Sequence, residues 1–282
     1  MVLLMNVSEL ISGANAWGLS ISEKQAEQFS LYGDLLLSWN RKFNLTRITE
    51  PSAVCRQHFL DSIAPMLFVD FSDRSLIDIG TGAGFPGIPL KIMNPSLKLT
   101  LLDALDKRCL FLREVAARLR FNEGDEKDEA CGGCSAGSVK ILHGRAEDFA
   151  ASKEEKSSKR GKLKASPHLP EREIPGEPGN ALRGSFDFAV SRAVAKLNIL
   201  CEYAVPFLKI GGQFIAYKLD NRKVELDDAA YAMLLLGASC ADNRIYTLPD
   251  VAPARALCFI KKDSATSEKY PRRAGIPEKK PL

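Results

Sequence analysis

The sequence has no long apolar run. None of its hydrophobic stretches approaches the ~20 consecutive residues that a membrane-spanning helix needs, so we expect no membrane segment. Its first ten residues contain neither a cationic region nor a small-residue cleavage site, so we also expect no secretory signal. Its seven cysteines are scattered and odd in number, which is typical of reduced thiols and predicts a cytoplasmic protein.

The paired cysteine motifs of a zinc site are also missing. Cys131 and Cys134 form one Cys-x-x-Cys pair, but no second pair at zinc spacing accompanies it. We therefore expect no bound metal. Cys109 and Cys201 fall within expected helices, where a core position explains them.

The charge of the chain is nearly balanced, and its small excess is concentrated at the end. The sequence has 39 Lys and Arg residues against 35 Asp and Glu residues, a net charge of +4. Residues 261–282 contain seven basic and three acidic residues, a net of +4 that equals the whole excess. A flexible basic tail at 263–282 suits a polyanionic partner, and a purely solubilising role explains it equally well.

Apolar spacing predicts an α/β fold behind a helical start. Helical spacing at 20–41, where Ser20 and Glu23 fit a capping box, and at 51–67 predicts helices there. Short apolar runs then alternate with amphipathic stretches, which is typical of a doubly wound, mostly parallel sheet, and two further runs at 243–248 and 255–261 predict an antiparallel edge hairpin. The other expected strands are 75–79, 97–102, 139–143, 186–190 and 213–218, and the expected helices between them are 87–93, 107–120, 197–208 and 223–236.

Composition suggests three parts in the chain. We expect a helical cap at 1–70, a main domain at 71–262 and the basic tail. Two segments of the main domain, about 122–138 and 151–185, have few large apolar side chains and cannot offset the cost of ordering. They are therefore expected to be mobile insertions.

A glycine-rich turn, within SLIDIGTGAGFPGIPL at 75–90, follows the first expected strand directly. A ligand can approach the bare backbone of such a turn closely. The glycines of this turn are Gly80, Gly82, Gly84 and Gly87. Residues 82–87 fit the dinucleotide fingerprint G-x-G-x-x-G, and Asp103 stands about 20 residues on, where a ribose-binding acid belongs. The candidate ligands are a nicotinamide or flavin dinucleotide and S-adenosylmethionine, and a purely structural tight turn is the alternative to both.

Asp78 favours S-adenosylmethionine. A carboxylate two residues before the first glycine would repel the pyrophosphate of a dinucleotide, whereas it stabilises a sulfonium and an α-ammonium group. Pro86 also removes a backbone donor from a turn that would otherwise cradle phosphate. We therefore predict a methyl-donor site in which the contacts of the first turn come from Asp78, Gly80, Gly82, Gly84 and Phe85.

The next two strand ends supply further candidate contacts to the donor. Asp103, with Ala104 beside it, would accept the ribose hydroxyls at the end of the second strand. Ala146 and Glu147 follow the third strand and would lie beside the adenine. An acid that faces water in the first turn of a helix explains Glu147 nearly as well.

Arg192 follows the fourth strand, whose carboxyl end faces the reaction crevice of a doubly wound sheet. We predict it as the catalytic residue, and its possible partners are the carboxylate of the donor, a nucleic-acid phosphate or a local acid. No Asn/Asp-Pro-Pro-aromatic motif follows this strand and no Pro-Cys pair exists, which argues against an exocyclic amino acceptor and against a cysteine nucleophile. An acceptor with a free lone pair, such as guanine N7, needs positioning rather than a base.

Several blocks of the sequence resemble the RsmG or GidB family of bacterial 16S ribosomal RNA guanine-N7 methyltransferases. They include WNRKFNLT at 39–46, RQHFLDSI at 56–63, DIGTGAGFPGIPL at 78–90 and SRAVA at 191–195. The resemblance implies a class I methyltransferase fold that transfers a methyl group from S-adenosylmethionine to one guanine N7. Its partner would be small-subunit ribosomal RNA or the 30S particle. Carried over by position, the donor contacts fall on Gly80, Phe85, Asp103, Ala146, Glu147 and Arg192.

Two rival functions stay open at this point. One is a nicotinamide-dependent oxidoreductase, and the other is a non-catalytic RNA-binding protein on a methyltransferase fold, against which the intact Asp78, turn and Asp103 argue. His58, Asp61 and Ser62 match a family block near the cofactor, but packing or helix capping explains them as well. We expect a monomer.

Overall fold

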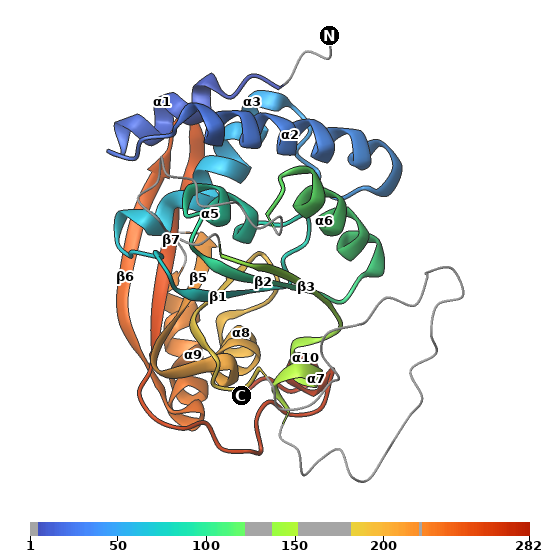
Figure 1. Ribbon diagram of the computed structural model, residues 1–282. Coiled ribbons are helices and arrows are strands. Elements are labelled where there is room, and N and C mark those ends of the chain that lie inside the picture. Colours follow the sequence, from blue (N-terminus) through green and yellow to red (C-terminus); the bar gives the residue numbers. More distant parts are fainter. Residues whose placement is uncertain (1–4, 122–136, 152–181, 220–221) are drawn as a thin grey trace, which may run out of the picture.

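The computed structural model describes residues 5–121, 137–151, 182–219 and 222–282 (Figure 1). The two expected insertions fall largely on 122–136 and 152–181, outside the described residues, and so do Cys131 and Cys134. Their expected mobility and the role of the cysteine pair therefore stay predictions.

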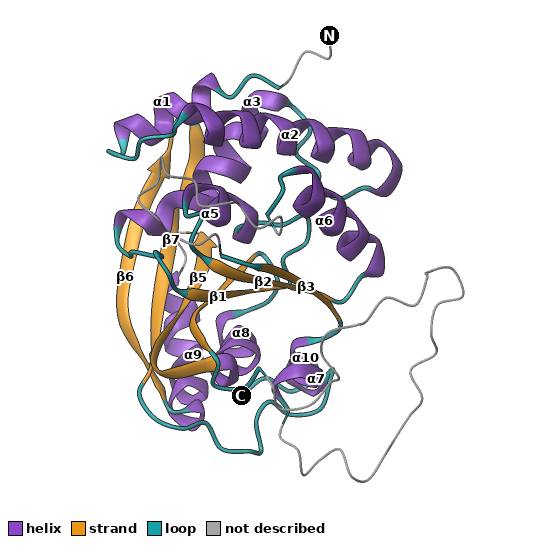
Figure 2. Cartoon of the chain, viewed as in Figure 1, coloured by secondary structure: helices purple, strands orange, loops and turns teal. Residues whose placement is uncertain are grey.

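A seven-stranded sheet with the strand order β3-β2-β1-β4-β5-β7-β6 lies at the centre of the molecule (Figure 2). The first five strands are parallel, and β7 runs antiparallel to both β5 and β6. The doubly wound sheet and its edge hairpin are therefore confirmed. The strands are β1 (Ser75–Ile79), β2 (Lys98–Asp103), β3 (Val139–His143), β4 (Phe186–Arg192), β5 (Leu208–Leu219), β6 (Ala238–Leu248) and β7 (Val251–Lys262).

Helices cover both faces of the sheet. Successive side chains of a strand point to opposite sides, so the buried strands present apolar residues on both faces. Leu76 packs into the cluster with the N-terminal helices, whereas its neighbour Ile77 packs into the cluster on the other face. The first face is covered by α5 (Gly87–Met93), α6 (Asp106–Arg118) and the N-terminal helices. The second face is covered by α7 (Ala146–Ala150), α8 (Leu197–Ala204) with its 3-10 extension η5 (Val205–Phe207), α9 (Arg222–Leu236) and α10 (Ile276–Lys279). Cys109 and Cys201 are buried, as predicted.

The N-terminal region is helical, as predicted, although α1 (Ser8–Ala16) was not expected. The capping box was predicted two residues too early. Because α2 (Glu23–Phe43) begins at Glu23, the extended residue before it is Ser22, which exchanges capping hydrogen bonds with Gln25.

A continuous helical stretch then leads to the sheet. It consists of α3 (Pro51–Val54), the π-helical turn η1 (Cys55–Leu60), α4 (Asp61–Ile63) and the 3-10 turn η2 (Ala64–Leu67). Single π turns inside helices frequently occur at functional sites. Here the turn precedes the buried Asp61 and Ser62. The N-terminal helices share one apolar cluster with the sheet, and a domain boundary near residue 70 stays an interpretation.

The C-terminal segment is not the flexible tail that we expected. Its Arg272 donates backbone and side-chain N–H groups to the fully buried carboxylate of Glu202, at 2.6–3.2 Å. Arg183 donates to the carbonyls of Thr266, Ser267 and Tyr270 at 2.6–3.0 Å. The segment is ordered because a buried acid on α8 needs a cation, and composition does not reveal such a partner.

We predict that Arg272→Ala lowers the free energy of unfolding by about 3–5 kcal/mol, because it leaves a buried carboxylate without its cation. Arg273→Ala is the matched control. It removes the same charge from an exposed residue and should change stability by less than ~0.5 kcal/mol. Urea unfolding measures both variants, and equal stabilities would show that this ion pair does not hold the segment.

Candidate active site

The glycine turn encloses the carboxylate of Asp78 at the carboxyl end of β1. The hydroxyl of Thr81 and the backbone N–H of Gly87 donate to its Oδ2 at 2.7 and 2.8 Å. Its Oδ1 is buried and has no hydrogen-bond partner among the described residues. Burial raises the pKa of Asp78 to about 7. A buried acceptor without a donor is the kind of group that a cationic ligand satisfies.

The turn is open at Gly82 and closely packed at Gly80 and Gly84. Gly80, Gly82 and Gly84 all have positive φ values, of +67°, +61° and +96°. A Cβ on Gly80 would lie 2.6 Å from a methyl of Val194, and one on Gly84 would lie 2.5 Å from Ile88. At Gly82 the nearest atom would be 4.0 Å away, so the backbone there is open.

Asp103 lies beside this turn at the end of β2, as its place in the sequence predicted. Its Oδ2 accepts the N–H of Gly82 at 2.9 Å and Arg108 at 3.2 Å, and its Oδ1 accepts the N–H of Leu105 at 2.9 Å. These donors fix the carboxylate between the ends of β1 and β2, beside the exposed Ala104. Its contact with ribose hydroxyls stays a prediction.

The loop after β3 is adjacent, because the N–H of Gly144 donates to the carbonyl of Asp103 at 2.9 Å. Ala146 begins α7 and is buried. Glu147 is only 5% exposed, and its Oε1 accepts the N–H of Gly275 from the C-terminal segment at 3.1 Å. The alternative in which Glu147 faces water is therefore wrong, and its contact with adenine stays a prediction.

Arg192 connects the glycine turn to the N-terminal helices. Its guanidinium carbon lies 5.2 Å from the ring centroid of Phe85, and its Nη1 donates to Oδ2 of Asp61 at 2.7 Å. The side chains of Arg192 and Asp61 are only 13% and 7% exposed. The partners expected for Arg192 were the donor carboxylate, a nucleic-acid phosphate or a local acid. The structure contains the last of these, Asp61.

His58 holds Arg192 and Phe85 in place. Its ring stacks on Phe85 with centroids 4.4 Å apart, its Nε2 lies 2.7 Å from the hydroxyl of Thr46, and its Nδ1 lies 3.3 Å from Nη2 of Arg192. Burial, followed by the charge of Arg192, lowers the pKa of His58 to about 3. The ring is therefore neutral at physiological pH, and Nδ1 is free to accept an N–H from Arg192.

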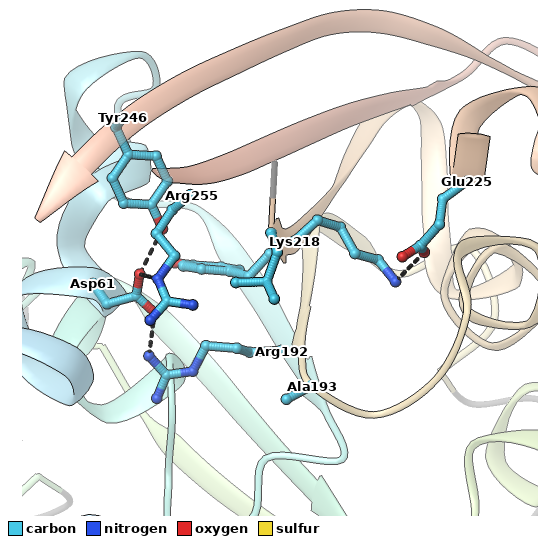
Figure 3. Close-up of a pocket in the computed structure, with 9 residues that line it drawn as sticks. Asp61, Arg192, Ala193, Lys218, Glu225, Tyr246 and Arg255 are labelled. Carbon is cyan, nitrogen blue, oxygen red and sulfur yellow. Dashed lines mark hydrogen bonds and ion pairs between the residues drawn. The ribbon is translucent and has the colours of Figure 1, made fainter. Parts of the chain in front are cut away.

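A pocket of about 330 Å³ opens beside Arg192 at the carboxyl ends of β4 and β5 (Figure 3). The hydroxyl of Tyr246 donates to Oδ1 of Asp61 at 2.7 Å, and the hydroxyl of Tyr217 donates to the carbonyl of Ser62 at 2.6 Å. Sequence reasoning missed Tyr217, Tyr246 and Arg255. They come from β5, β6 and β7, and only the antiparallel register brings them together, for example by pairing Tyr246 with Arg255.

Neither a metal cluster nor a membrane helix occurs in the part of the chain that the structure describes. Within it, no three His, Cys, Asp or Glu side chains are grouped as ligands for a metal ion. No helix in these residues combines the length and the apolar character that crossing a membrane requires.

Comparison with known proteins identifies the family. A family model described as rRNA small subunit methyltransferase G matches residues 25–125. The ribosomal RNA small subunit methyltransferase G of Streptococcus gordonii is 39% identical over 267 residues, and that of Streptococcus equi subsp. zooepidemicus is 41% identical over 267 residues; each alignment covers 94% of both chains.

A solved structure agrees at the level of the fold. The O-methyltransferase from Bacillus cereus in complex with SAH has a TM-score of 0.50 and 14% identity, and the match covers 91% of this chain and 100% of that one. At this identity the likeness concerns the class I methyltransferase fold alone. The relatives from Streptococcus decide the family, and the chain belongs to the rRNA small subunit methyltransferase G family.

Proposed function

We propose that this protein transfers a methyl group from S-adenosylmethionine to N7 of a guanine in small-subunit ribosomal RNA. The choice of S-adenosylmethionine as the methyl donor rests on one observation: Oδ1 of Asp78 is buried and lacks a hydrogen-bond partner among the described residues. A sulfonium or an ammonium group would satisfy it, whereas a pyrophosphate would be repelled. This argues against the nicotinamide-dependent oxidoreductase.

The residues that would hold the donor surround the open backbone of Gly82. Asp78 faces its cationic groups, and the carboxylate of Asp103 lies where the ribose hydroxyls are expected. Arg192, fixed by Asp61 and stacked near Phe85, offers a cation to the donor carboxylate or to an RNA phosphate. When bound, S-adenosylmethionine supplies an electrophilic methyl group on a positively charged sulfur.

The side chains around the pocket support an acceptor that needs no base. His58 is neutral with both ring nitrogens engaged, and burial raises the pKa of Tyr217 and Tyr246 well above the usual range. The lone pair of guanine N7 forms the new N–C bond as the S–C bond breaks with its electrons on sulfur, and no proton moves. The protein therefore contributes positioning.

We propose small-subunit ribosomal RNA, free or in the 30S particle, as the partner, and the cytoplasm as the location. The C-terminal segment packs on the body, yet Arg273, Lys279 and Lys280 stay exposed on it. These side chains are available to RNA phosphates.

We predict that Gly80→Asp abolishes donor binding. The new side chain would collide with Val194, adopt a strained positive φ and add negative charge beside Asp78. Gly18→Asp is the control, because it carries the same charge at a similar φ of +76° in open space. Calorimetry with S-adenosylmethionine compares the two, and wild-type affinity of the Gly80 variant would refute the placement of the donor.

We also predict that donor affinity rises with pH. Because burial raises the pKa of Asp78 to about 7, the free protein below pH 7 holds a proton that a cation must displace. The dissociation constant for S-adenosylmethionine should fall by about 20-fold between pH 5.5 and 7.5. Asp78→Asn should weaken binding and remove most of this dependence. A pH-independent dissociation constant of the wild-type protein would contradict the role of Asp78.

The function itself is tested by mapping N7-methylguanine in small-subunit RNA after incubation of unmethylated 30S particles with protein and S-adenosylmethionine. The wild-type protein should methylate one guanine. Arg192→Ala should lower the rate by ~100-fold or more, because it removes a positioning group. Arg118→Ala, on the exposed surface of α6, should be nearly unchanged. Absence of methylation by the wild-type protein would refute the proposal.

A further inference from the structure

Among the described residues, three cationic side chains line the pocket beside Arg192, and two of them are paired with acids. Arg192 pairs with Asp61 at 2.7 Å. Lys218 pairs with Glu225 and donates to the carbonyl of Ala195 at 2.9 Å. Each of these cations thus has an acid and lies in a defined position.

The third cation, Arg255 on β7, is different. Among the described residues its acid partner is Asp61, whose Oδ1 lies 4.0 Å from Nε, too far for a hydrogen bond. Its Nε is buried and has no hydrogen-bond partner among the described residues. The side chain is nevertheless only 21% exposed. Largely buried donors without acceptors are rare in folded proteins and call for an explanation.

Asp61 does not satisfy the N–H donors of Arg255, because its nearer oxygen, Oδ1, lies 4.0 Å from Nε and outside hydrogen-bond distance. Both of its oxygens accept hydrogen bonds from other residues. Oδ2 takes Arg192 at 2.7 Å, and Oδ1 takes the hydroxyl of Tyr246 at 2.7 Å. Figure 3 shows the guanidinium groups of Arg192 and Arg255 against the same carboxylate. The described lining of the pocket therefore has three cations against two acids, which favours a ligand with an acceptor oxygen.

We infer that Arg255 binds O6 of the acceptor guanine and thereby selects guanine over adenine. The inference rests on the proposed function. O6 and N7 lie on one edge of guanine and both accept hydrogen bonds, whereas adenine presents its N6 amino donor in place of O6. An arginine that binds O6 would leave the N7 lone pair free. An adenine would instead place its N6 amino donor against the N–H donors of Arg255.

The position of the pocket agrees with this assignment. It opens at the carboxyl ends of β4 and β5, and β4 pairs with β1, which carries the glycine turn. Arg192 lines the pocket on one side and reaches the ring of Phe85 in the turn on the other. A base held at Arg255 thus enters next to the place where we put the methyl donor.

The test compares two RNA substrates in methyl transfer by the full-length protein. One carries guanosine at the nucleotide that the wild-type protein methylates, and the other carries 2-aminopurine there, which keeps N7 but lacks O6. Arg255→Ala should lower kcat/KM on the guanosine RNA by roughly 10- to 100-fold, since one good base contact gives discrimination of that order. It should have little further effect on the 2-aminopurine RNA and leave the affinity for S-adenosylmethionine unchanged.

Two further variants sharpen the comparison. Arg244→Ala is the matched control, because Arg244 is an exposed arginine of the same hairpin, paired with Asp242. Arg255→Lys keeps the charge but not the fork of N–H donors, so it should recover only part of the activity on guanosine RNA. It also guards against a failure of the alanine variant to fold.

The outcomes distinguish a failure of base selection by Arg255 from a failure of the proposed methyl transfer. A wild-type protein that methylates no guanosine refutes the proposed function. If it does methylate, equal activities of Arg255→Ala and Arg244→Ala overturn the inference. An equal loss on both RNAs, restored by Arg255→Lys, would assign Arg255 to a phosphate and also overturn base selection.

Discussion

The ion pair between Asp61 and Arg192 is the interaction on which the candidate active site depends. Arg192 ends β4, and Asp61 follows the π-helical turn of the N-terminal region, so the pair joins these helices to the edge of the sheet where we place the methyl donor. A buried pair is stable only when further hydrogen bonds complete it, and here Tyr246 and His58 supply them. Leaving either charge alone would be costly, which fixes the position of the arginine.

Asp78 shows the opposite use of a buried carboxylate. Asp61 is satisfied within the protein, whereas one oxygen of Asp78 has no donor among the described residues and its pKa is raised to about 7 by burial. A fold tolerates such a group where a ligand completes it. The two acids thus have different roles: Asp61 positions Arg192, and we propose that Asp78 binds the cationic groups of the methyl donor.

The sequence predicts the parts of this site that depend on contiguous residues. The strands, the glycine turn, Asp78 and Asp103 follow from apolar runs and from the positions of glycine and acid next to them. Tyr217, Tyr246 and Arg255 could not be found in this way, because they meet only through the register of β5, β6 and β7. The start of α2 was misplaced for a smaller reason, since two serines, Ser20 and Ser22, could each cap it.

The C-terminal segment shows why a charge count is a weak guide to RNA binding. Arg272 is neutralised by Glu202, and Lys262 is buried against the carbonyls of Val205 and Leu208. Both cations contribute to the net charge, but Arg272 holds the segment on the body and Lys262 is a buried residue of β7. We propose that the exposed side chains of the segment reach phosphates and that Arg255, which belongs to the sheet, binds the reacting base. Electrostatic attraction and base selection are therefore assigned to different parts of the fold.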